Sequence, residues 1–343
     1  MGDILHALPA VTALRQSHPG WFLGWALEPR WEPLFRDAAG GMPLIDGIHL
    51  ANAKAWARDP ISRQTFHEIR ELRRELRAER YDVCVDLQGA VRSALLARAA
   101  GAPRIAGEAC PREPLARWLF RERIPTNGVH VIEQAVEVCN AIAGDRLEPI
   151  LPRLPMDAES EAWANALLQM GQRGEPDRPV ILLSPGAGWG AKRWPPERYG
   201  QLAAKLDAAG CQVLVNAGPE ERAIANTVVA SSRARSAAAE QFGVLAPEFT
   251  LSRLIAVTRR ASLAIAGDTG PLHLACALGK PVVGIFGPTE PKRNGPFGVP
   301  FRVLRHPESK RDHTRRAAPE AGLLTIAPDQ VFAAAMELLQ RGA

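Results

Sequence analysis

The residues best suited to chemistry lie in the stretch AGDTGPLHLA. A short apolar segment delivers Asp268 and Thr269 to the expected first turn of a helix, where free N–H groups and the helix dipole favour an anion such as a diphosphate. Gly270 lets the backbone approach a ligand closely, Asp268 can accept hydrogen bonds from sugar hydroxyls, and His273 can donate to a phosphate or hydroxyl. A second interpretation needs no ligand: Asp268 and Thr269 cap the helix, and His273 is a hydrogen-bonded interior histidine.

Two further loops carry charged residues of the kind that bind nucleotides. The loop SPGAGWGAKRWPP contains Lys192, which can neutralise the charge that builds on a departing diphosphate; a solvated loop lysine is the alternative. The loop NAGPEER places Glu220 and Glu221 after an expected strand end, where a carboxylate suits ribose hydroxyls. Acids in the first turn of a helix explain those two residues equally well.

The opening stretch GDILHALPA resembles the turn that carries a strand into a helix. Asp3 stands at the expected helix start, a position typical of a simple N-cap. The strand that should precede such a turn is missing.

The elements that position these loops alternate between strands and helices along the chain. Apolar runs at 21–27, 81–89, 179–188 and 211–218 read as strands, and an amphipathic segment at 66–80 reads as a helix, which is the pattern of parallel sheets joined by crossover helices. A length of 343 residues suits two domains. We expect an N-terminal domain at 1–152, a polar and proline-rich linker at 153–178, and a C-terminal domain at 179–343.

Composition excludes several classes of protein. The five cysteines are odd in number and form no CxxC pair, so neither a disulfide framework nor a metal site is expected. No apolar run is long enough to span a bilayer, and the N-terminus lacks the features of a signal peptide, so the predicted location is the cytoplasm. The formal net charge of +5 without dense basic runs favours phosphorylated small molecules or lipid headgroups over nucleic acid.

Six motifs together resemble one family. GDILHALPAV, DLQGAVRSAL, REPLA, PGAGWGAKRWP, AGDTGPLHLACALGKP and IFGPTEPKRNGPFG stand in the order and spacing of the ADP-heptose heptosyltransferases, the family 9 glycosyltransferases that build the lipopolysaccharide inner core. The resemblance covers nearly the whole chain, and the pairing of DTGxxH with FGPTxP is quite specific for this family. The REPLA element and the basic stretch near residue 54 look most like heptosyltransferase I.

The resemblance implies an α/β protein of GT-B architecture, with two doubly wound Rossmann-like domains facing a cleft. It implies an inverting transfer from ADP-heptose that has no obligatory metal or other cofactor. The family's catalytic base falls on Asp3, its diphosphate-contacting lysine on Lys192, and its donor loop on Asp268, Thr269, Gly270 and His273. An inverting transfer needs one carboxylate to take the acceptor proton, and positive charge to stabilise the leaving ADP.

The acceptor implied by the family, Kdo-lipid A, is strongly anionic. Basic residues of the N-terminal domain are therefore expected to contact it, and the candidates are Lys54, Arg58, Arg92 and Arg112. Arginines on the 66–80 helix are interleaved with Glu71, Glu75 and Glu79 and read mostly as a solvated face. A monomer that touches the cytoplasmic face of the inner membrane peripherally, and that binds no nucleic acid, is expected.

Family members carry an apolar strand before the motif that holds Asp3, so this chain is expected to lack its first strand. Several alternatives stay open: heptosyltransferase II, another family 9 transferase, or an inactive nucleotide-sugar-binding protein. A nucleotide-dependent oxidoreductase is disfavoured because no GxGxxG opens a strand–helix unit.

Overall fold

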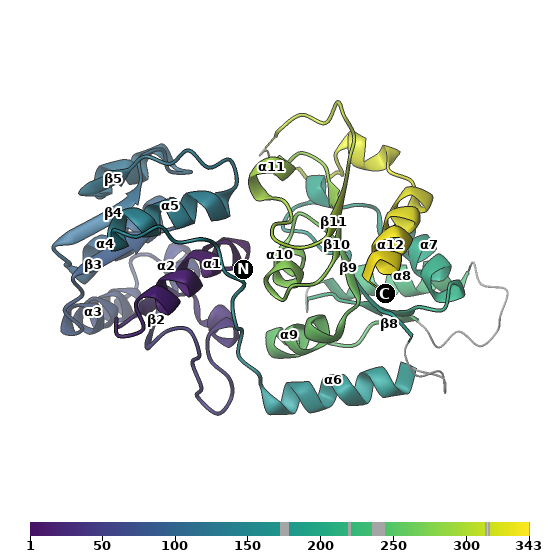
Figure 1. Ribbon diagram of the computed structural model, residues 1–343, viewed down its shortest axis with the longest axis horizontal. Coiled ribbons are helices and arrows are strands. Elements are labelled where there is room, and N and C mark those ends of the chain that lie inside the picture. Colours follow the sequence, from purple (N-terminus) through teal and green to yellow (C-terminus); the bar gives the residue numbers. More distant parts are fainter. Residues whose placement is uncertain (172–177, 219–220, 235–243, 313, 315, 343) are drawn as a thin grey trace. The chain divides into compact units, whose positions relative to one another are not determined.

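The computed structural model describes residues 1–343 apart from 172–177, 219–220, 235–243, 313, 315 and 343. The chain divides between Pro155 and Met156 into two compact units (Figure 1). The N-terminal unit holds residues 3–155 and the C-terminal unit residues 156–343. Helix α6, which spans Ala158–Gly171, falls within the range expected to be a linker and belongs to the C-terminal unit.

The C-terminal unit is built on a six-stranded parallel sheet. Its spatial order, β8-β7-β6-β9-β10-β11, is the 3-2-1-4-5-6 order of a doubly wound dinucleotide-binding sheet. The four inner strands are buried runs of mostly branched and small apolar residues, as expected where helices cover both faces. The edge strand β11 is only partly buried and contains two arginines. The six strands are β6 (Val180–Ser184), β7 (Gln212–Val215), β8 (Val244–Leu245), β9 (Leu263–Gly267), β10 (Val282–Phe286) and β11 (Phe301–Arg305).

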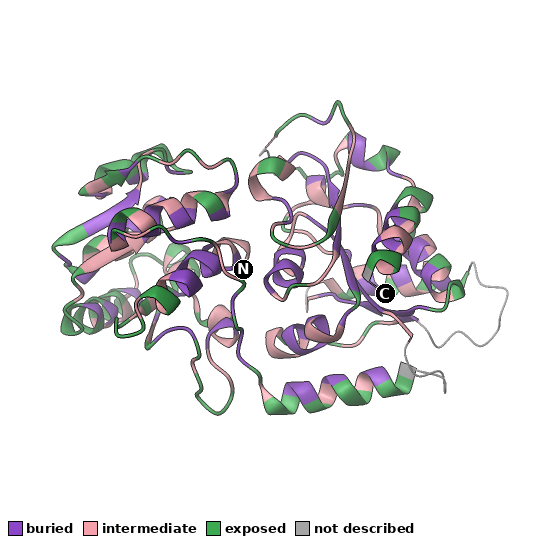
Figure 2. Cartoon of the chain, in the orientation of Figure 1, coloured by how far each residue is buried: buried purple, intermediate pink, exposed green. Residues whose placement is uncertain are grey.

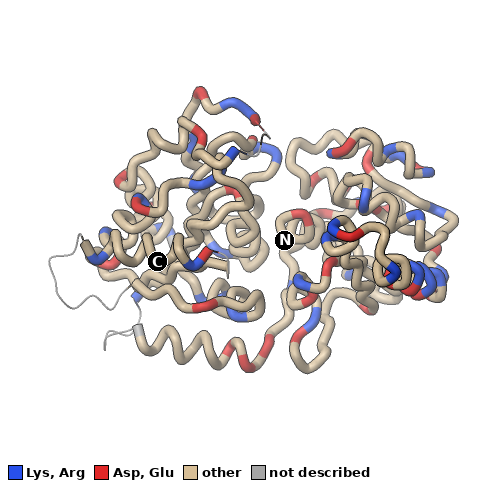
Figure 3. The backbone as a smooth tube through the Cα atoms, turned by 180° about the vertical axis from the view of Figure 1, so that it is seen from behind, with Lys and Arg blue, Asp and Glu red and all other residues tan. Residues whose placement is uncertain are grey.

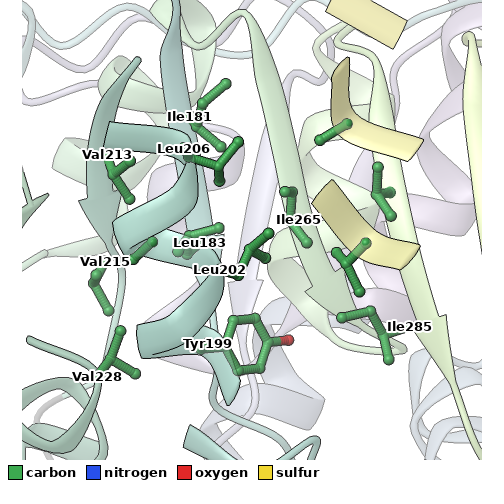
Figure 4. Close-up of a cluster of buried hydrophobic side chains, with 14 of the residues drawn as sticks. Ile181, Leu183, Tyr199, Leu202, Leu206, Val213, Val215, Val228, Ile265 and Ile285 are labelled. Carbon is green, nitrogen blue, oxygen red and sulfur yellow. The ribbon is translucent and has the colours of Figure 1, made fainter. Parts of the chain in front are cut away.

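Helices cover both faces of this sheet (Figure 1). Alternate residues of the strands, such as Ile181, Leu183 and Ile265, pack with Tyr199 and Leu202 of α7 in one buried cluster (Figure 4), because successive side chains of a strand point to opposite faces. Helices α8 and α12 complete that cluster, and α9 and α10 lie against the other face. The segments are η3 (Gly190–Lys192), α7 (Pro196–Ala208), α8 (Arg222–Arg233), α9 (Leu251–Arg260), α10 (Gly270–Ala277), α11 (Pro291–Asn294), η5 (Ala321–Thr325) and α12 (Pro328–Gly342).

The N-terminal unit contains two separate parallel sheets. One has the order β1-β2 and the other β3-β4-β5. In the C-terminal unit the first strand, β6, lies between the second, β7, and the fourth, β9. In the N-terminal unit, helix α1 precedes all the described strands in the chain. The described elements are α1 (Gly2–Ser17), β1 (Gly24–Leu27), η1 (Pro29–Leu34), β2 (Gly47–Leu50), α2 (Ala53–Arg58), α3 (Arg63–Ala78), β3 (Val83–Asp86), α4 (Val91–Ala100), β4 (Arg104–Glu108), η2 (Pro114–Leu119), β5 (Glu122–Ile124) and α5 (Val131–Ala143).

Most elements expected from the sequence occur with shifted ends. The helix expected at 66–80 begins three residues earlier because the Ser62 hydroxyl accepts a hydrogen bond from the Thr65 N–H and caps it. The inner strands of the C-terminal sheet are buried, the strands of the N-terminal sheets are partly exposed, and the outer helix faces are exposed (Figure 2). Among the described residues, no helix combines the length and apolar character needed to cross a membrane.

Candidate active site

The first candidate group of residues lies at the switch point of the C-terminal sheet. Strands β6 and β9 are neighbours there although they lead to helices on different sides, and ligands of doubly wound sheets bind outside the carboxyl ends of such strands. The loop after β6 carries Lys192, and the loop after β9 carries Asp268. Both loops were predicted from their sequences to bind an anion.

The structure brings Lys192, Asp268 and His273 together. Lys192 Nζ donates to Asp268 Oδ2, and Asp268 Oδ1 lies 3.2 Å from His273 Nε2. All three side chains are nearly buried, with exposed fractions of 12%, 7% and 6%. Lys192 Nζ also lies 4.2 Å from the centre of the Trp189 ring, within the range of a cation–π contact.

The Asp268 carboxylate is held ionised by its neighbours. Burial alone would raise its pKa, but the hydrogen bond and charge of His273 and the charge of Lys192 outweigh that effect, and the pKa lies well below its ordinary value. Both carboxylate oxygens are engaged by side chains, so Asp268 fixes the positions of both Lys192 and His273.

The geometry also bears on the capping interpretation. Thr269 is the N-cap residue of α10 by position, but its side chain makes no capping hydrogen bond, and its hydroxyl donates to the Gly267 carbonyl instead. Asp268 faces Lys192 rather than the helix N–H groups. The helix begins at Gly270, so its first-turn N–H groups lie beside the buried cluster of Lys192, Asp268 and His273. His273 is both an interior histidine and a partner of Asp268.

A segment without any recognisable motif supports the Lys192 loop. The Ala191 N–H donates to the Arg316 carbonyl, and the Glu320 N–H donates to the Ala191 carbonyl. A Cβ atom at Gly190 would lie 1.6 Å from the Ala317 carbonyl oxygen, so only glycine allows this approach. The Arg-rich stretch near residue 316, uninterpretable from sequence, therefore serves to hold the lysine loop.

Of the two acids in the NAGPEER loop, Glu220 lies outside the described residues. Glu221 lies at the N-terminus of α8, and its Oε2 accepts a hydrogen bond from the Gly218 N–H at 3.1 Å. A Cβ atom at Gly186 would lie within 2.4 Å of its carboxylate, so Glu221 sits close against the loop after β6. It is placed at the carboxyl edge of the sheet, where sequence reasoning expected an acid.

The second group of candidates lies in the N-terminal unit around Asp3. Asp3 belongs to the first turn of α1, while Met1 occupies the N-cap position, so the simple N-cap interpretation does not describe it. Gln88 Nε2 donates to Asp3 Oδ2 at 2.6 Å, and Arg112 Nη1 lies 3.2 Å from both oxygens. Partial burial raises the pKa of Asp3, but Arg112 and Gln88 lower it more, and the net shift is downward.

A buried carboxylate shapes the loop that carries Gln88. Asp86 ends strand β3 and accepts hydrogen bonds from the N–H groups of Gln88 and Gly89 and from the Ser93 hydroxyl. Burial raises its pKa in spite of these bonds. The role of Gln88 was missed by sequence analysis; the DLQG turn after an apolar strand was the available signal.

The four basic acceptor candidates divide into two pairs. Arg112 contacts Asp3, and the neighbouring Glu113 carboxylate accepts from the Val91 N–H at the start of α4, which places Arg92 at the same end of that helix. Lys54 and Arg58 are exposed on α2 and, within the described part of the chain, take part in no ion pair with Asp3. Across the described residues, no cluster of His, Cys, Asp and Glu could hold a metal ion.

Comparisons with known proteins decide the family. Residues 69–323, more than half of the chain, match the family model for glycosyltransferase family 9 (heptosyltransferase). This chain belongs to glycosyltransferase family 9. Among curated family 9 relatives, lipopolysaccharide heptosyltransferase 1 of Pseudomonas aeruginosa is 27% identical over 304 residues, covering 87% of this chain and 79% of the relative. Lipopolysaccharide heptosyltransferase 2 of Escherichia coli K12 is 28% identical over 255 residues, covering 69% of each.

The fold of this family 9 enzyme is also that of solved relatives. The structure of E. coli heptosyltransferase WaaC with ADP superimposes with a TM-score of 0.74 at 23% identity, covering 100% of this chain and 97% of that one. The predicted GT-B fold with two Rossmann-like units is confirmed. Within it, Asp3 lies in one unit and the Lys192, Asp268 and His273 cluster in the other.

Proposed function

We propose that this family 9 glycosyltransferase moves a heptosyl group from ADP-heptose to the Kdo residue of the lipid A inner core, with inversion at the anomeric carbon. The buried cluster of Lys192, Asp268 and His273 at the switch point carries the proposal. A positive charge fixed beside a helix N-terminus is the arrangement that suits a diphosphate leaving group. The names of the curated relatives support heptose as the sugar.

The donor occupies the C-terminal unit in this proposal. Lys192 and the N–H groups of Thr269 and Gly270, at the N-terminal end of α10, contact the diphosphate. His273 donates to a phosphate or sugar oxygen. Asp268 keeps Lys192 and His273 in place. Glu221 accepts hydrogen bonds from ribose hydroxyls, since it lies at the carboxyl edge beside the β6 loop.

The acceptor hydroxyl is activated by Asp3. As the hydroxyl oxygen forms its bond to the anomeric carbon, Asp3 takes the proton, the bond from that carbon to the diphosphate breaks, and the electron pair leaves with ADP. Gln88 and Arg112 hold the carboxylate ionised before the acceptor arrives. When the acceptor binds, its own anionic groups compete with Asp3 for Arg112, which leaves the carboxylate more basic.

The acceptor is proposed to be the type I acceptor, Kdo-lipid A, and its charged groups are met by Arg112, Arg92, Lys54 and Arg58. Arginine and lysine side chains that are exposed near Asp3 or on α2 suit carboxylates and phosphates. The protein is proposed to work at the cytoplasmic face of the inner membrane, because its acceptor is a lipid. It is proposed to act there as a monomer.

A transfer assay with two acceptors tests the proposal. Purified protein is incubated with ADP-heptose and either Kdo-lipid A or its heptosylated form. The masses of the products are measured by mass spectrometry, and the release of ADP is followed in parallel. We expect one added heptose on Kdo-lipid A only. Transfer solely to the heptosylated acceptor would make the enzyme a type II transferase. Tight ADP-heptose binding without transfer to either acceptor would make it a nucleotide-sugar-binding protein and overturn the proposal.

A further inference from the structure

Three large apolar side chains of η2 and of the neighbouring helix α4 are exposed in the N-terminal unit. Leu115 and Trp118 of η2 are 70% and 63% exposed, and Leu95 of α4 is 53% exposed. We call these three residues the η2 patch. Trp118 is among the most exposed large aromatic side chains of the described chain, and its exposure calls for an explanation, because burial of such a ring is strongly favourable.

The geometry of η2 places two members of the patch side by side. In a 3-10 helix, residues three apart lie directly above one another, so Leu115 and Trp118 share the outward face. The inward face is already filled: Ala116 and Phe120 are buried against Ile105 of β4. The two exposed side chains therefore take no part in this buried cluster.

Leu95 extends the patch from the neighbouring helix. Arg98 Nη1 of α4 donates to the Leu119 carbonyl at the end of η2, and Leu95 lies one turn earlier on α4, on the same face as Arg98. Helix α4 also packs directly on η2. Leu95 is thus an exposed apolar side chain of the helix that packs on η2.

Cationic groups surround the Trp118 ring. The guanidinium carbons of Arg117 and Arg123 lie 4.9 Å and 5.0 Å from its centre, and Arg123 Nε donates to the Arg117 carbonyl. The nearby acids are engaged elsewhere, since Glu122 pairs with Arg104 and Glu113 accepts from the Val91 N–H. Elsewhere in the N-terminal unit, Lys and Arg are interspersed with Asp and Glu (Figure 3), so the excess of positive charge is a local property of this segment. The surface around Trp118 is consequently both apolar and positively charged.

We propose that the η2 patch docks on an anionic lipid bilayer. Trp118, Leu115 and Leu95 enter the boundary between headgroups and acyl chains, where Trp is favoured, and Arg117 and Arg123 bind lipid phosphates. The inference names a partner surface for the proposed function and rests on it only for the identity of the acceptor. Arg112, which contacts Asp3, lies three residues before Leu115 in the same segment, so docking would bring a lipid-borne acceptor to the carboxylate.

Vesicle sedimentation of the full chain tests the docking. Vesicles of phosphatidylethanolamine with phosphatidylglycerol should pellet the protein, vesicles of phosphatidylcholine should pellet much less, and added salt should weaken the binding. The double variant Leu115→Ser, Trp118→Ser should bind the anionic vesicles about tenfold more weakly. A matched exposed leucine in the C-terminal unit, Leu324, provides the control Leu324→Ser, which should bind like the wild type.

A second double variant tests the docking independently if the serine variant folds poorly. Arg117→Gln with Arg123→Gln leaves the apolar side chains in place and should abolish the preference for anionic over neutral vesicles. Equal binding by both double variants and the wild type would overturn the proposal. So would a change of oligomeric state in the serine variant without a change in vesicle binding, because the patch would then be an interface between copies.

The vesicle assay contains neither donor nor acceptor, so its failure is separate from failure of the proposed transfer. Binding without transfer would uphold the docking and overturn the proposed function. If the wild type transfers heptose to Kdo-lipid A and the η2 patch variants bind vesicles normally, the proposed function is upheld and the docking is overturned.

Discussion

Lys192 and Asp268 form a buried ion pair across 76 positions of the sequence, at the point where the strand order of the C-terminal sheet reverses. Each residue belongs to one βα loop, and His273 lies within hydrogen-bond distance of the second oxygen of the carboxylate. Burying an ion pair is costly because both charges lose their hydration. The position of this pair is therefore better explained by the binding of a charged ligand than by a gain in folding stability.

Removal of the lysine charge should slow the chemical step. We expect Lys192→Ala to lower kcat by about 10²-fold, the scale of one lost electrostatic donor to a developing anion, and to change donor affinity less. Steady-state kinetics with saturating ADP-heptose measures this. Lys205→Ala, which removes an exposed lysine of α7 paired with Asp329, is the control and should keep the wild-type rate. A normal kcat for Lys192→Ala would remove the residue from the mechanism.

The depressed pKa of Asp268 predicts a pH dependence of stability. A carboxyl group whose pKa is lower in the folded state stabilises the protein above its unfolded pKa, near 3.9, and this contribution is lost as pH falls further towards the folded pKa. Urea unfolding followed between neutral and acidic pH should show the loss, and Asp268→Asn should show less of it.

A second buried ion pair separates stability from function at this site. Asp207 pairs with Arg178 far from the switch-point loops, and both side chains are nearly buried. Asp207→Asn should destabilise the protein and leave donor use by the folded fraction unchanged, whereas Asp268→Asn should impair both. If the folded fraction of Asp268→Asn were fully active, the role of Asp268 would be structural only.

Gln88 should act through the ionisation of Asp3. Gln88→Leu removes the donor to the carboxylate, so the pKa of Asp3 rises and the acidic limb of the kcat/KM profile moves to higher pH, because the base must be ionised. The rate at the optimum should fall roughly tenfold, as for a lost hydrogen bond to a charged group. Gln64→Leu, which alters an exposed glutamine of α3, should leave the profile in place; an unshifted limb in Gln88→Leu would contradict the assignment.

Two neighbouring glycines offer a matched test of the lysine loop. A Cβ at Gly190 would collide with the Ala317 carbonyl, whereas a Cβ at Gly188 would meet open space. Gly190→Ala should therefore displace the loop, lower kcat and weaken ADP binding measured by calorimetry, while Gly188→Ala should behave like the wild type. Equal behaviour of the two variants would show that the 316–320 segment does not position Lys192.

The four inner strands of the C-terminal sheet, β6, β7, β9 and β10, were predictable because they are continuous apolar runs that end in loops containing glycine. The edge strands β8 and β11 were not predicted, because β8 has two residues and β11 contains two arginines. The partners of the site residues were not, because a contact such as Gln88 to Asp3 spans 85 positions and depends on tertiary packing. The two candidate loops could be named, but the direct pairing of Lys192 with Asp268 could not.

Helix α6 was not predicted, because the composition around it indicated a linker. Its flanks are polar and rich in proline, which is typical of a linker. Yet Glu161 bonds to Arg259 and Arg260 of α9, Trp163 lies against Phe249, and Ala164 is fully buried. Helix packing of this kind depends on a partner surface that is distant in the sequence.

The comparison of transfer with ADP binding in Asp3→Asn tests the central claim most directly. Asparagine keeps the size of the side chain and one acceptor oxygen for Gln88 or Arg112, but it carries no charge and cannot take a proton. We expect transfer from ADP-heptose to Kdo-lipid A to fall by about 10²- to 10⁴-fold, while ADP binds to the C-terminal unit with unchanged affinity. Transfer at the wild-type rate by Asp3→Asn would contradict the account, since another group would then accept the proton.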